Sequence, residues 1–283
     1  MIDHPSLQEF FDSPGALAAD LNMSASASEP LSQDELLALE PDAAERFNKT
    51  TLTYPTRHAE LELLDGITKR YQSVTPDGLL PTSGVDESLG VLFLSLVEPG
   101  DRVVVLTPCY PPHLMLPTWR GAEIERWKAQ AENDWAPDLD ELRRLTEKPT
   151  RLIITTFPQN PTGFMPNANF NAELLNIVEA SGAILVADEI YAGLPSGSAN
   201  GLSNLADQHD RVISLHGLSK TLGLPGLRLG WMAARDPALL ESIRDVRTLF
   251  NAYVPVPIDF LANLALRHED AILARNTAIL ETG

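Results

Sequence analysis

The stretch Ser214-Leu-His-Gly-Leu-Ser-Lys-Thr-Leu-Gly-Leu-Pro-Gly-Leu-Arg-Leu-Gly-Trp231 decides how the rest of the chain is interpreted. It contains one lysine, Lys220, and one arginine, Arg228, eight residues later. The apolar segments 211–215 and 227–232 on either side have the pattern of short buried strands. Burial disfavours a charged ammonium, so a lysine in this apolar setting loses its proton easily. Such an amine is suited to forming a Schiff base with an aldehyde, although most loop lysines are simply solvated.

The Ser219-Lys220 pair with an arginine eight residues on resembles the lysine segment of fold-type I pyridoxal-phosphate (PLP) enzymes of the class I/II aminotransferase family. The resemblance implies that Lys220 carries the cofactor as a Schiff base, with Ser219 beside it. It also implies that Arg228 binds the phosphate, a role that suits a planar, permanently charged guanidinium. The family usually has Ser or Thr three residues before the lysine, where this chain has Gly217.

Composition excludes several classes of protein. The 283 residues suffice for one large domain or two modest ones. The net charge of −18, from 21 basic and 39 acidic residues, argues against nucleic acid or an anionic membrane as a partner. Cys109 is the single cysteine, which fits a reducing compartment. The start of the chain has no signal-peptide pattern and the apolar run at 89–97 is too short for a bilayer, so we predict a cytoplasmic protein.

Short apolar runs alternate with helical patterns along most of the chain. The runs expected to be strands are 102–106, 121–127, 151–157, 183–187 and 211–215. The segments expected to be helices are 6–11, 60–71, 85–97, 138–145, 168–181, 236–250 and 257–280. This alternation predicts an α/β fold with a mostly parallel sheet flanked by helices. Open sheets of this kind bind ligands at the carboxyl edge of their strands.

Two candidate groups come before and after the strand expected at 102–106. A Ser-Gly turn before the helix at 85–97 lets backbone N–H groups meet an anion, and the resemblance assigns the cofactor phosphate to the Gly84 and Val85 amides. That signal alone is weak, because many α/β proteins have a glycine there for packing. Tyr110, two residues after Pro108, is by resemblance the aromatic that stacks on the cofactor ring. Taken alone, it is equally consistent with a core aromatic.

Three more candidates follow the strands expected at 151–157 and 183–187. Asn160 opens an Asn-Pro-Thr-Gly turn, and the resemblance implies that it bonds the phenolic oxygen of the cofactor, although any such sequence can form a β-turn. Asp188 follows the apolar run 183–187 and by resemblance pairs with the pyridinium N–H, which keeps the ring protonated. Tyr191 would donate to the phenolic oxygen. An isolated Asp after a strand is more often a helix cap, so the assignment rests on the shared order of these residues.

The resemblance also implies a homodimer whose active site lies at the two-fold interface. A tyrosine of the partner reaches the phosphate in that family, and Tyr54 in Leu52-Thr-Tyr-Pro55 occupies the matching stretch. A turn aromatic packed on its own subunit is an equal alternative. The family usually has Gly four residues later, where this chain has His58.

The expected domain organisation follows from the same resemblance. Residues 1–50 are an N-terminal arm with the start of small-domain elements, including an extended stretch at 22–30. Residues 51–255 are the PLP-binding large domain, and residues 256–283 start the interdomain helix. A C-terminal small domain, which carries the arginine that grips the substrate carboxylate in the family, is expected to be absent or truncated.

The predicted function is a PLP-dependent aminotransferase acting on an amino acid and a keto acid. Lys220 would serve as the general base, and Asp188 would stabilise the protonated ring. The segments 135–142 and 218–228 are also similar to capreomycidine-synthase-like members, so PLP-dependent elimination and cyclisation is an alternative. A truncated domain that binds PLP without turnover is a third possibility. A DNA-binding regulator is disfavoured, because residues 1–50 are acidic.

Overall fold

The computed structural model describes residue 9 and residues 12–18, 20, 26, 28–193 and 204–282, and of residues 57–59 it describes the backbone alone. The short helix expected at 6–11 lies almost entirely outside the described residues, as do residues 22–25 and 27 of the expected extended stretch. Within the described ranges, no helix is both long and apolar enough to cross a membrane.

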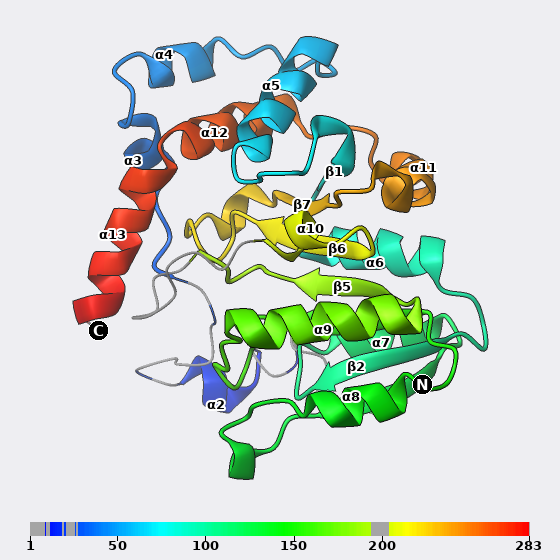
Figure 1. Ribbon diagram of the computed structural model, residues 1–283. Coiled ribbons are helices and arrows are strands. Elements are labelled where there is room, and N and C mark those ends of the chain that lie inside the picture. The colour runs from blue at the N-terminus through cyan, green and yellow to red at the C-terminus, as the bar shows by residue number, and fades with distance from the viewer. Residues whose placement is uncertain are drawn as a thin grey trace.

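Among the described residues, one seven-stranded sheet lies at the centre of the molecule, with strand order β1-β7-β6-β5-β4-β2-β3 (Figure 1). The strands are β1 Leu79–Thr82, β2 Arg102–Thr107, β3 Glu123–Lys128, β4 Leu152–Thr156, β5 Ile184–Asp188, β6 Val212–Gly217 and β7 Gly230–Ala233. Of the described strands, β7 alone runs antiparallel to its neighbours, β1 and β6. The remaining neighbouring pairs are parallel. The predicted α/β fold with a mostly parallel sheet is therefore confirmed.

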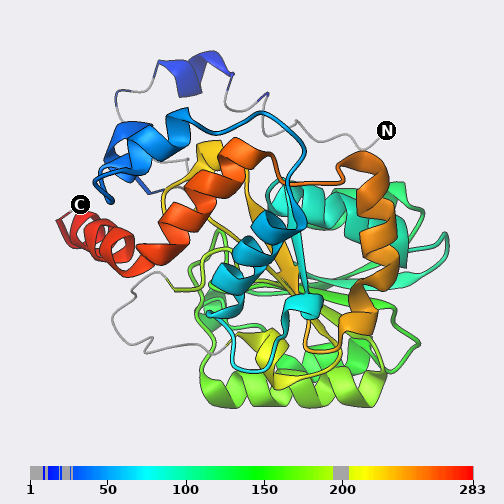
Figure 2. The same cartoon turned by 90° about the horizontal axis from the view of Figure 1, so that it is seen from above.

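Helices cover both faces of this sheet. The helices on one face are α5 Arg57–Thr68, α8 Leu139–Leu145, α9 Ala168–Ser181, α10 Leu205–Gln208 and α12 Val256–Arg267. Those on the other face are α6 Val85–Leu96, α7 Pro112–Trp119 and α11 Glu241–Phe250. Figure 2 shows α9 and α6 on opposite sides of the sheet. The central strands are buried on both faces, which is why their sequences are continuous apolar runs.

Shorter elements complete the described chain. They are α2 Pro14–Leu17, α3 Gln33–Leu37, α4 Ala43–Asn48, α13 Glu269–Thr282 and the 3-10 turns η1 Pro76–Gly78, η2 Ala131–Asn133, η3 Pro225–Leu227 and η4 Pro237–Leu240. Ser32 and Glu35 form a capping box at the start of α3.

Several predicted boundaries were wrong. The helix expected at 236–250 is divided into η4 and α11, and the helix expected at 257–280 is divided into α12 and α13 at His268. Apolar residues recur on both sides of each division, so both pairs of helices were joined in the prediction, although residues 267–270 at the second division are all charged or polar. The strand expected at 227–232 starts only at Gly230, because η3 precedes it and Arg228 adopts a left-handed conformation with φ 47°. Helix α7 was not predicted, because its prolines indicated a turn, although prolines are tolerated in the first turn of a helix.

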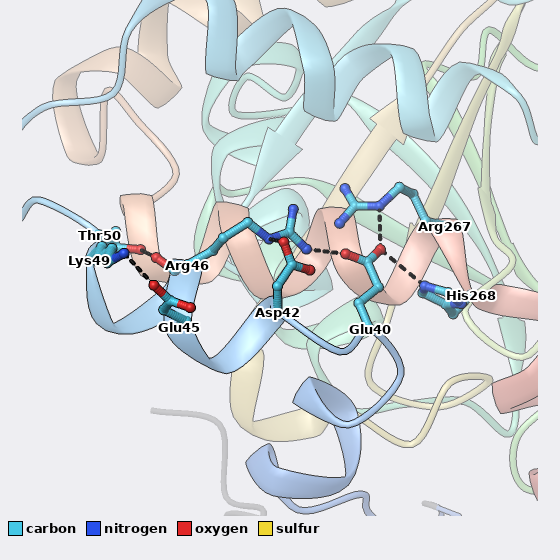
Figure 3. Close-up of polar contacts among 8 residues, drawn as sticks. All are labelled: Glu40, Asp42, Glu45, Arg46, Lys49, Thr50, Arg267 and His268. Carbon is cyan, nitrogen blue, oxygen red and sulfur yellow. Dashed lines mark hydrogen bonds and ion pairs between the residues drawn. The ribbon is translucent and has the colours of Figure 1, made fainter.

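A polar cluster around Glu40 attaches the α3–α4 segment to the end of α12 (Figure 3). The Glu40 carboxylate accepts hydrogen bonds from Arg267 Nε at 3.0 Å and from His268 Nε2 at 3.1 Å, and it also contacts Arg46. The hydrogen bond from Arg267, with the contributions of His268 and Arg46, lowers the pKa of Glu40 to about 2 against the effect of burial. This cluster fixes the N-terminal segment to a helix more than 200 residues away in sequence.

The loop that carries Lys220 is held from two sides by segments near the two ends of the described chain. Ser28 Oγ donates a hydrogen bond to the Lys220 carbonyl oxygen at 2.8 Å, and Leu31 N donates to Gly223 O at 3.3 Å. From α13, the fully buried Asn276 donates from Nδ2 to Thr221 O at 2.8 Å. The backbone of this loop is therefore fixed by tertiary contacts that cross the whole chain.

Candidate active site

The turns that bear the candidate residues meet at one edge of the sheet. Gly84 and Val85 follow β1, Tyr110 follows β2, Asn160 follows β4, Asp188 ends β5 and Lys220 follows β6. Arg228 precedes β7 rather than following it, but β7 is antiparallel, so its first residue lies at the same edge. Parallel strands thus bring together side chains that are more than 130 residues apart in sequence.

A cavity of about 160 Å³ lies at this edge. Its walls are formed by Ser26, Val85, Asp86, Tyr110, Thr156, Asn160, Asp188, Ile190, Tyr191, Ser219, Lys220, Pro225 and Arg228. Every candidate residue from the sequence is in this set except Gly84, which lies against Arg228, and Tyr54. The structure therefore gathers the candidates around one space, while their chemical roles remain predictions.

Lys220 is half-buried in the cavity wall. Its Nζ lies 3.2 Å from Ser26 Oγ and 5.9 Å from the centre of the Tyr191 ring. Burial lowers the pKa of the Lys220 amine, while the charges of Asp86 and Asp188 act in the opposite direction. The net lowering of the Lys220 pKa agrees with the expectation of a lysine that loses its proton easily.

Asn160 and Tyr191 form a hydrogen-bonded pair beside the lysine. Asn160 Nδ2 donates to Tyr191 Oη at 3.2 Å, and Tyr191 Oη donates to Ser26 Oγ at 2.9 Å. Burial raises the pKa of the Tyr191 phenol, so at neutral pH this group keeps its proton and acts as a donor. Two polar groups that the resemblance places on one phenolic oxygen are thus neighbours in space.

Asp188 is buried, with 3% of its surface exposed, and its two oxygens face different groups. Its Oδ1 accepts a hydrogen bond from Ile190 N at 3.2 Å, and its Oδ2 lies 3.1 Å from His113 Nε2. That second contact is close in distance, but the His113 N–H is not directed along a hydrogen bond to the carboxylate. The other ring nitrogen of His113 lies 3.4 Å from Thr156 Oγ1. The buried imidazole of His113 therefore lies against the Asp188 carboxylate at the end of β5.

Arg228 lies at the N-terminus of α6. A Cβ on Gly84, whose φ is 86°, would lie 2.7 Å from Arg228 Nη2, so the arginine packs directly over this glycine. Arg228 Nη2 also donates to Asp86 Oδ2 at 3.1 Å, and Tyr110 Oη donates to Asp86 Oδ1 at 3.0 Å. The guanidinium, the helix N-terminus and the Tyr110 ring are thereby held next to one another.

Packing accounts for the glycine that departs from the family pattern. A Cβ on Gly217 would lie 3.0 Å from Leu229 O and 3.1 Å from Ile190 Cδ1. A serine or threonine at this position would therefore require the neighbouring backbone to move. The close packing around Gly217 therefore disfavours the hydroxyl residue that the family usually has here.

Tyr54 is not part of the cavity described above. Its residue surface is 81% exposed, and its ring lies 5.8 Å from that of Tyr253. The phosphate role that the resemblance gives to this tyrosine requires a second copy of the chain, which stays a prediction.

A larger hollow of about 400 Å³ is lined by residues of α5, α12 and α13. Four of its charged groups form ion pairs: Arg70 pairs with Glu269, and Arg267 pairs with Glu62. It contains none of the candidate residues, so we place the chemistry in the smaller cavity.

Two residues of the cavity wall, Ser26 and Asp86, and His113 beside Asp188 were missed as functional candidates. Ser26 lies in a polar stretch without periodicity, and Asp86 lies in the first turn of a helix, where the helix dipole alone is enough to explain an acidic residue. His113 follows the proline-rich stretch that ends at residue 112. A histidine directly after three prolines and an aromatic, at a strand end, was the available signal for this last residue.

The comparisons with known proteins bear on this geometry. The model of the family described as aminotransferase class I and II matches residues 22–281. The chain belongs to this family. That match includes every turn that contributes to the cavity.

Individual relatives of the class I and II aminotransferase family agree with this placement. Capreomycidine synthase of Streptomyces vinaceus is 36% identical over 195 residues, which cover 69% of this chain and 50% of that protein. The crystal structure of a PLP-dependent aminotransferase from Streptococcus suis superposes with a TM-score of 0.82 at 32% identity, over 91% of this chain and 69% of that one. The PLP-dependent cyclase OrfR gives a TM-score of 0.85 at 27% identity, over 98% of this chain and 72% of that one. The chain spans about half the length of the curated relatives that it matches.

Proposed function

We propose that this chain acts as a PLP-dependent aminotransferase on an amino acid and a keto acid. The observation that carries the proposal is the half-buried Lys220, with a lowered pKa, in one cavity with Arg228 and Asp188. An amine, a phosphate-binding cation and a buried carboxylate match the three reactive parts of PLP: its aldehyde, its phosphate and its ring nitrogen.

The chain's own groups fit this cofactor. The amides at the start of α6 and the Arg228 guanidinium would hold the phosphate. The Tyr110 ring would lie against the cofactor ring, and Asn160 with Tyr191 would bond its phenolic oxygen. Asp188 would hold the proton of the ring nitrogen, because a buried carboxylate favours a nearby positive charge. When bound, PLP supplies an aldehyde and an electron-withdrawing ring.

Lys220 would then move the proton of the reaction. A neutral amine can take a proton from the α-carbon of an amino acid and return it elsewhere. Burial keeps the Lys220 amine closer to that neutral form than an exposed lysine would be. The Tyr191 ring beside Nζ limits the positions that the amine can adopt.

We propose that the functional form is a homodimer. Large hydrophobic side chains with 45–85% of their surface exposed occur around the Tyr54 turn and the end of α11, and they are Leu52, Tyr54, Leu249, Phe250 and Tyr253. Exposed apolar groups of this size favour burial against another surface. A second copy that covers them would bring Tyr54 to a partner's cavity, as the family resemblance implies. The domain limits predicted above, and a cytoplasmic location, also remain proposals.

A second candidate is PLP-dependent elimination and cyclisation. It is favoured by the 36% identity to a protein named capreomycidine synthase and by the superposition on a protein named PLP-dependent cyclase. Both reactions need the same lysine, phosphate site and buried carboxylate, so the cavity does not separate them.

An acceptor assay separates the two reactions. The purified chain with PLP is given a panel of L-amino acids, with and without 2-oxoglutarate or pyruvate, and amino transfer is followed by mass spectrometry. Transamination predicts a new amino acid that requires the keto acid. Loss of water or ring closure without an acceptor would support the second candidate. Cofactor held on Lys220 with neither reaction would contradict both.

A further inference from the structure

A further cavity, of about 210 Å³, lies at the edge of the sheet that β1 forms (Figure 1). We call it the β1-edge cavity. Its walls come from α5, η1, β1, α11 and the start of α12. Among the described residues, it shares none with the cavity at Lys220. A ligand of the β1-edge cavity would therefore be separate from the chemistry proposed for Lys220.

Arg247 of α11 is a buried cation in the wall of the β1-edge cavity. Only 5% of its surface is exposed, and within the described residues its buried Nε has no hydrogen-bond partner. Burial lowers the pKa of the guanidinium, while the charges of Glu87 and Glu60 oppose this effect without an ion pair to it. A guanidinium still keeps its proton at neutral pH. A positive charge is thus buried here without a contact that offsets its lost hydration.

Two acids of this region are not the missing counter-ion. Glu87 Oε2 accepts a hydrogen bond from Ser83 N, at the start of α6. Burial raises the pKa of Asp259 to about 6, and the charge of Glu62 adds to that effect. A carboxylate beside a guanidinium would have a lowered pKa instead, so Asp259 does not neutralise Arg247.

Arg244 provides a second guanidinium in the same wall, one turn before Arg247 on α11. Its Nη2 donates to Asp77 O at 2.9 Å. A guanidinium has five N–H donors, so this contact leaves others for a ligand. Planar groups of this kind bind carboxylates and phosphates, often through two parallel hydrogen bonds.

The rest of the wall restricts which anion fits. Apolar surface favours a hydrocarbon tail, and the buried leucines that supply it are Leu63, Leu64, Leu79 and Leu80. The carboxylates of Glu60 and Asp259 also line the cavity and would repel a second negative charge. The volume is below the roughly 300–1,000 Å³ that is typical of pockets for drug-sized molecules, so the ligand is small.

We propose that the β1-edge cavity binds a small monocarboxylate with a short aliphatic tail, whose carboxylate pairs with Arg247 and Arg244. The carboxylate oxygens supply the acceptors that the buried guanidinium lacks. The tail lies against the four leucines. Binding depends on the negative charge, because a neutral molecule of the same shape cannot compensate a buried cation.

The test compares butyrate with butyramide, which has nearly the same shape and no charge. The full chain, labelled at its leucine methyl groups, is titrated with each compound and followed by NMR, with and without PLP. Butyrate should shift the methyl signals of Leu63, Leu64, Leu79 and Leu80 in a saturable way. Its affinity should exceed that of butyramide by at least about tenfold, as for hydrogen bonds to a charged group. Succinate and phosphate should bind more weakly than butyrate, and PLP should change none of these affinities.

Variants locate the charge that binds butyrate. Arg247→Met should reduce the preference for butyrate over butyramide to less than about twofold, because the buried cation is gone. The urea midpoint of this variant should equal or exceed that of wild type, since an unpaired buried charge is replaced by an apolar side chain. Arg144→Met is the matched control, because Arg144 is an exposed arginine of α8 outside this cavity.

Other outcomes overturn the proposal. Wild-type protein that does not bind butyrate, or that binds butyramide equally well, would contradict it without any variant. A preference for butyrate that survives in Arg247→Met, or shifts confined to other leucines, would place the anion elsewhere. Weaker self-association of Arg247→Met in sedimentation, with no effect of butyrate on wild type, would show that an acid of a second copy neutralises Arg247 instead.

Discussion

At the scale of single residues, Asp188 is almost fully buried at the end of β5. Its Oδ1 accepts a hydrogen bond from Ile190 N, and its Oδ2 lies 3.1 Å from His113 Nε2. A carboxylate fixed in this way needs no reorganisation when a positive charge forms beside it. A helix cap would need only the contact with Ile190, so the buried histidine favours the chemical role.

Replacing the Asp188 carboxylate separates its effect on PLP binding from its effect on proton exchange. Asp188→Ala should leave PLP binding largely intact, because the phosphate contacts and the lysine are unchanged. Exchange of the α-proton should fall on the order of 10²-fold or more, as for the loss of a positioned electrostatic group. Proton exchange into deuterated water, followed by NMR on the substrate, measures the effect. Unchanged exchange would show that Asp188 is only a cap.

At the scale of elements, the start of α6 requires a glycine. Gly84 has φ 86° and ψ 168°, a region that is essentially restricted to glycine. A methyl group there would also displace the Arg228 side chain, whose Nη2 would lie 2.7 Å from the new atom. The conformation of this turn and the position of the phosphate-binding cation are therefore coupled.

Two glycines of the same helix give a matched pair of variants. Gly84→Ala should weaken PLP affinity by roughly tenfold, because strain of about 1–3 kcal/mol is relieved by moving the turn and Arg228. Gly90→Ala meets no atom within 4 Å and should leave PLP affinity unchanged. It should raise the free energy of unfolding by about 0.5–1 kcal/mol, since alanine favours a helix. Fluorescence titration with PLP and urea denaturation check both. Equal PLP affinities would contradict the role of the Gly84 turn.

The Glu40 cluster makes the attachment of α3 and α4 dependent on pH. The folded pKa of Glu40, about 2, lies below its unfolded value of 4.5, so the ionised form stabilises the fold above pH 4.5. That contribution is lost as the pH falls from 4.5 through about 2. Arg46 and Arg267 are more than a third exposed, so solvent screens the interaction and we expect roughly 1–2 kcal/mol.

Urea denaturation at several pH values checks this expectation. Glu40→Gln should lower the free energy of unfolding at pH 7, and its difference from wild type should shrink as the pH approaches 4 and below. Glu45→Gln, in the same segment, breaks a fully exposed pair with Lys49 and should have little effect. A Glu40→Gln difference that is independent of pH would rule out the ionised carboxylate as the cause.

The sequence predicted the elements that depend on local pattern. Buried strands such as β4 and β5 begin with apolar runs, and the polar residues at and after their carboxyl ends carry the chemistry. The division between α12 and α13 was missed, because apolar residues recur on both sides of His268; the run of four charged or polar residues at 267–270 was the available signal. Helix α7 was missed because proline indicates a turn more often than a helix start.

The residues of the cavity divide in the same way, into those that local sequence pattern reveals and those that long-range contacts place there. The resemblance identified residues at fixed spacing around Lys220, and these surround one space in the structure. Ser26 and His113 were not identified. Their positions depend on an arm that returns to the lysine loop and on a helix that packs behind Asp188. Such long-range contacts leave no periodicity in the sequence.

At the scale of the whole molecule, the proposed dimer makes cofactor binding depend on association. If Tyr54 reaches a partner's phosphate, Tyr54→Phe should weaken PLP affinity by about 1 kcal/mol, or about fivefold, the value of one hydrogen bond. Affinity should also fall on dilution, because binding that needs the dimer is linked to assembly. PLP titration at several protein concentrations, with sedimentation alongside, measures both. A monomer with constant affinity would contradict the shared site.

The proposal that Lys220 holds PLP is tested most directly by identifying which lysine binds the cofactor. The chain has five lysines, and Lys220 alone belongs to the proposed cavity, whereas Lys69 lines the larger hollow. The purified chain is incubated with PLP, reduced with borohydride, digested and analysed by peptide mass spectrometry. The account predicts a yellow protein before reduction and a single modified peptide labelled at Lys220. A label on Lys69 or on another lysine, or no stable label, would contradict it.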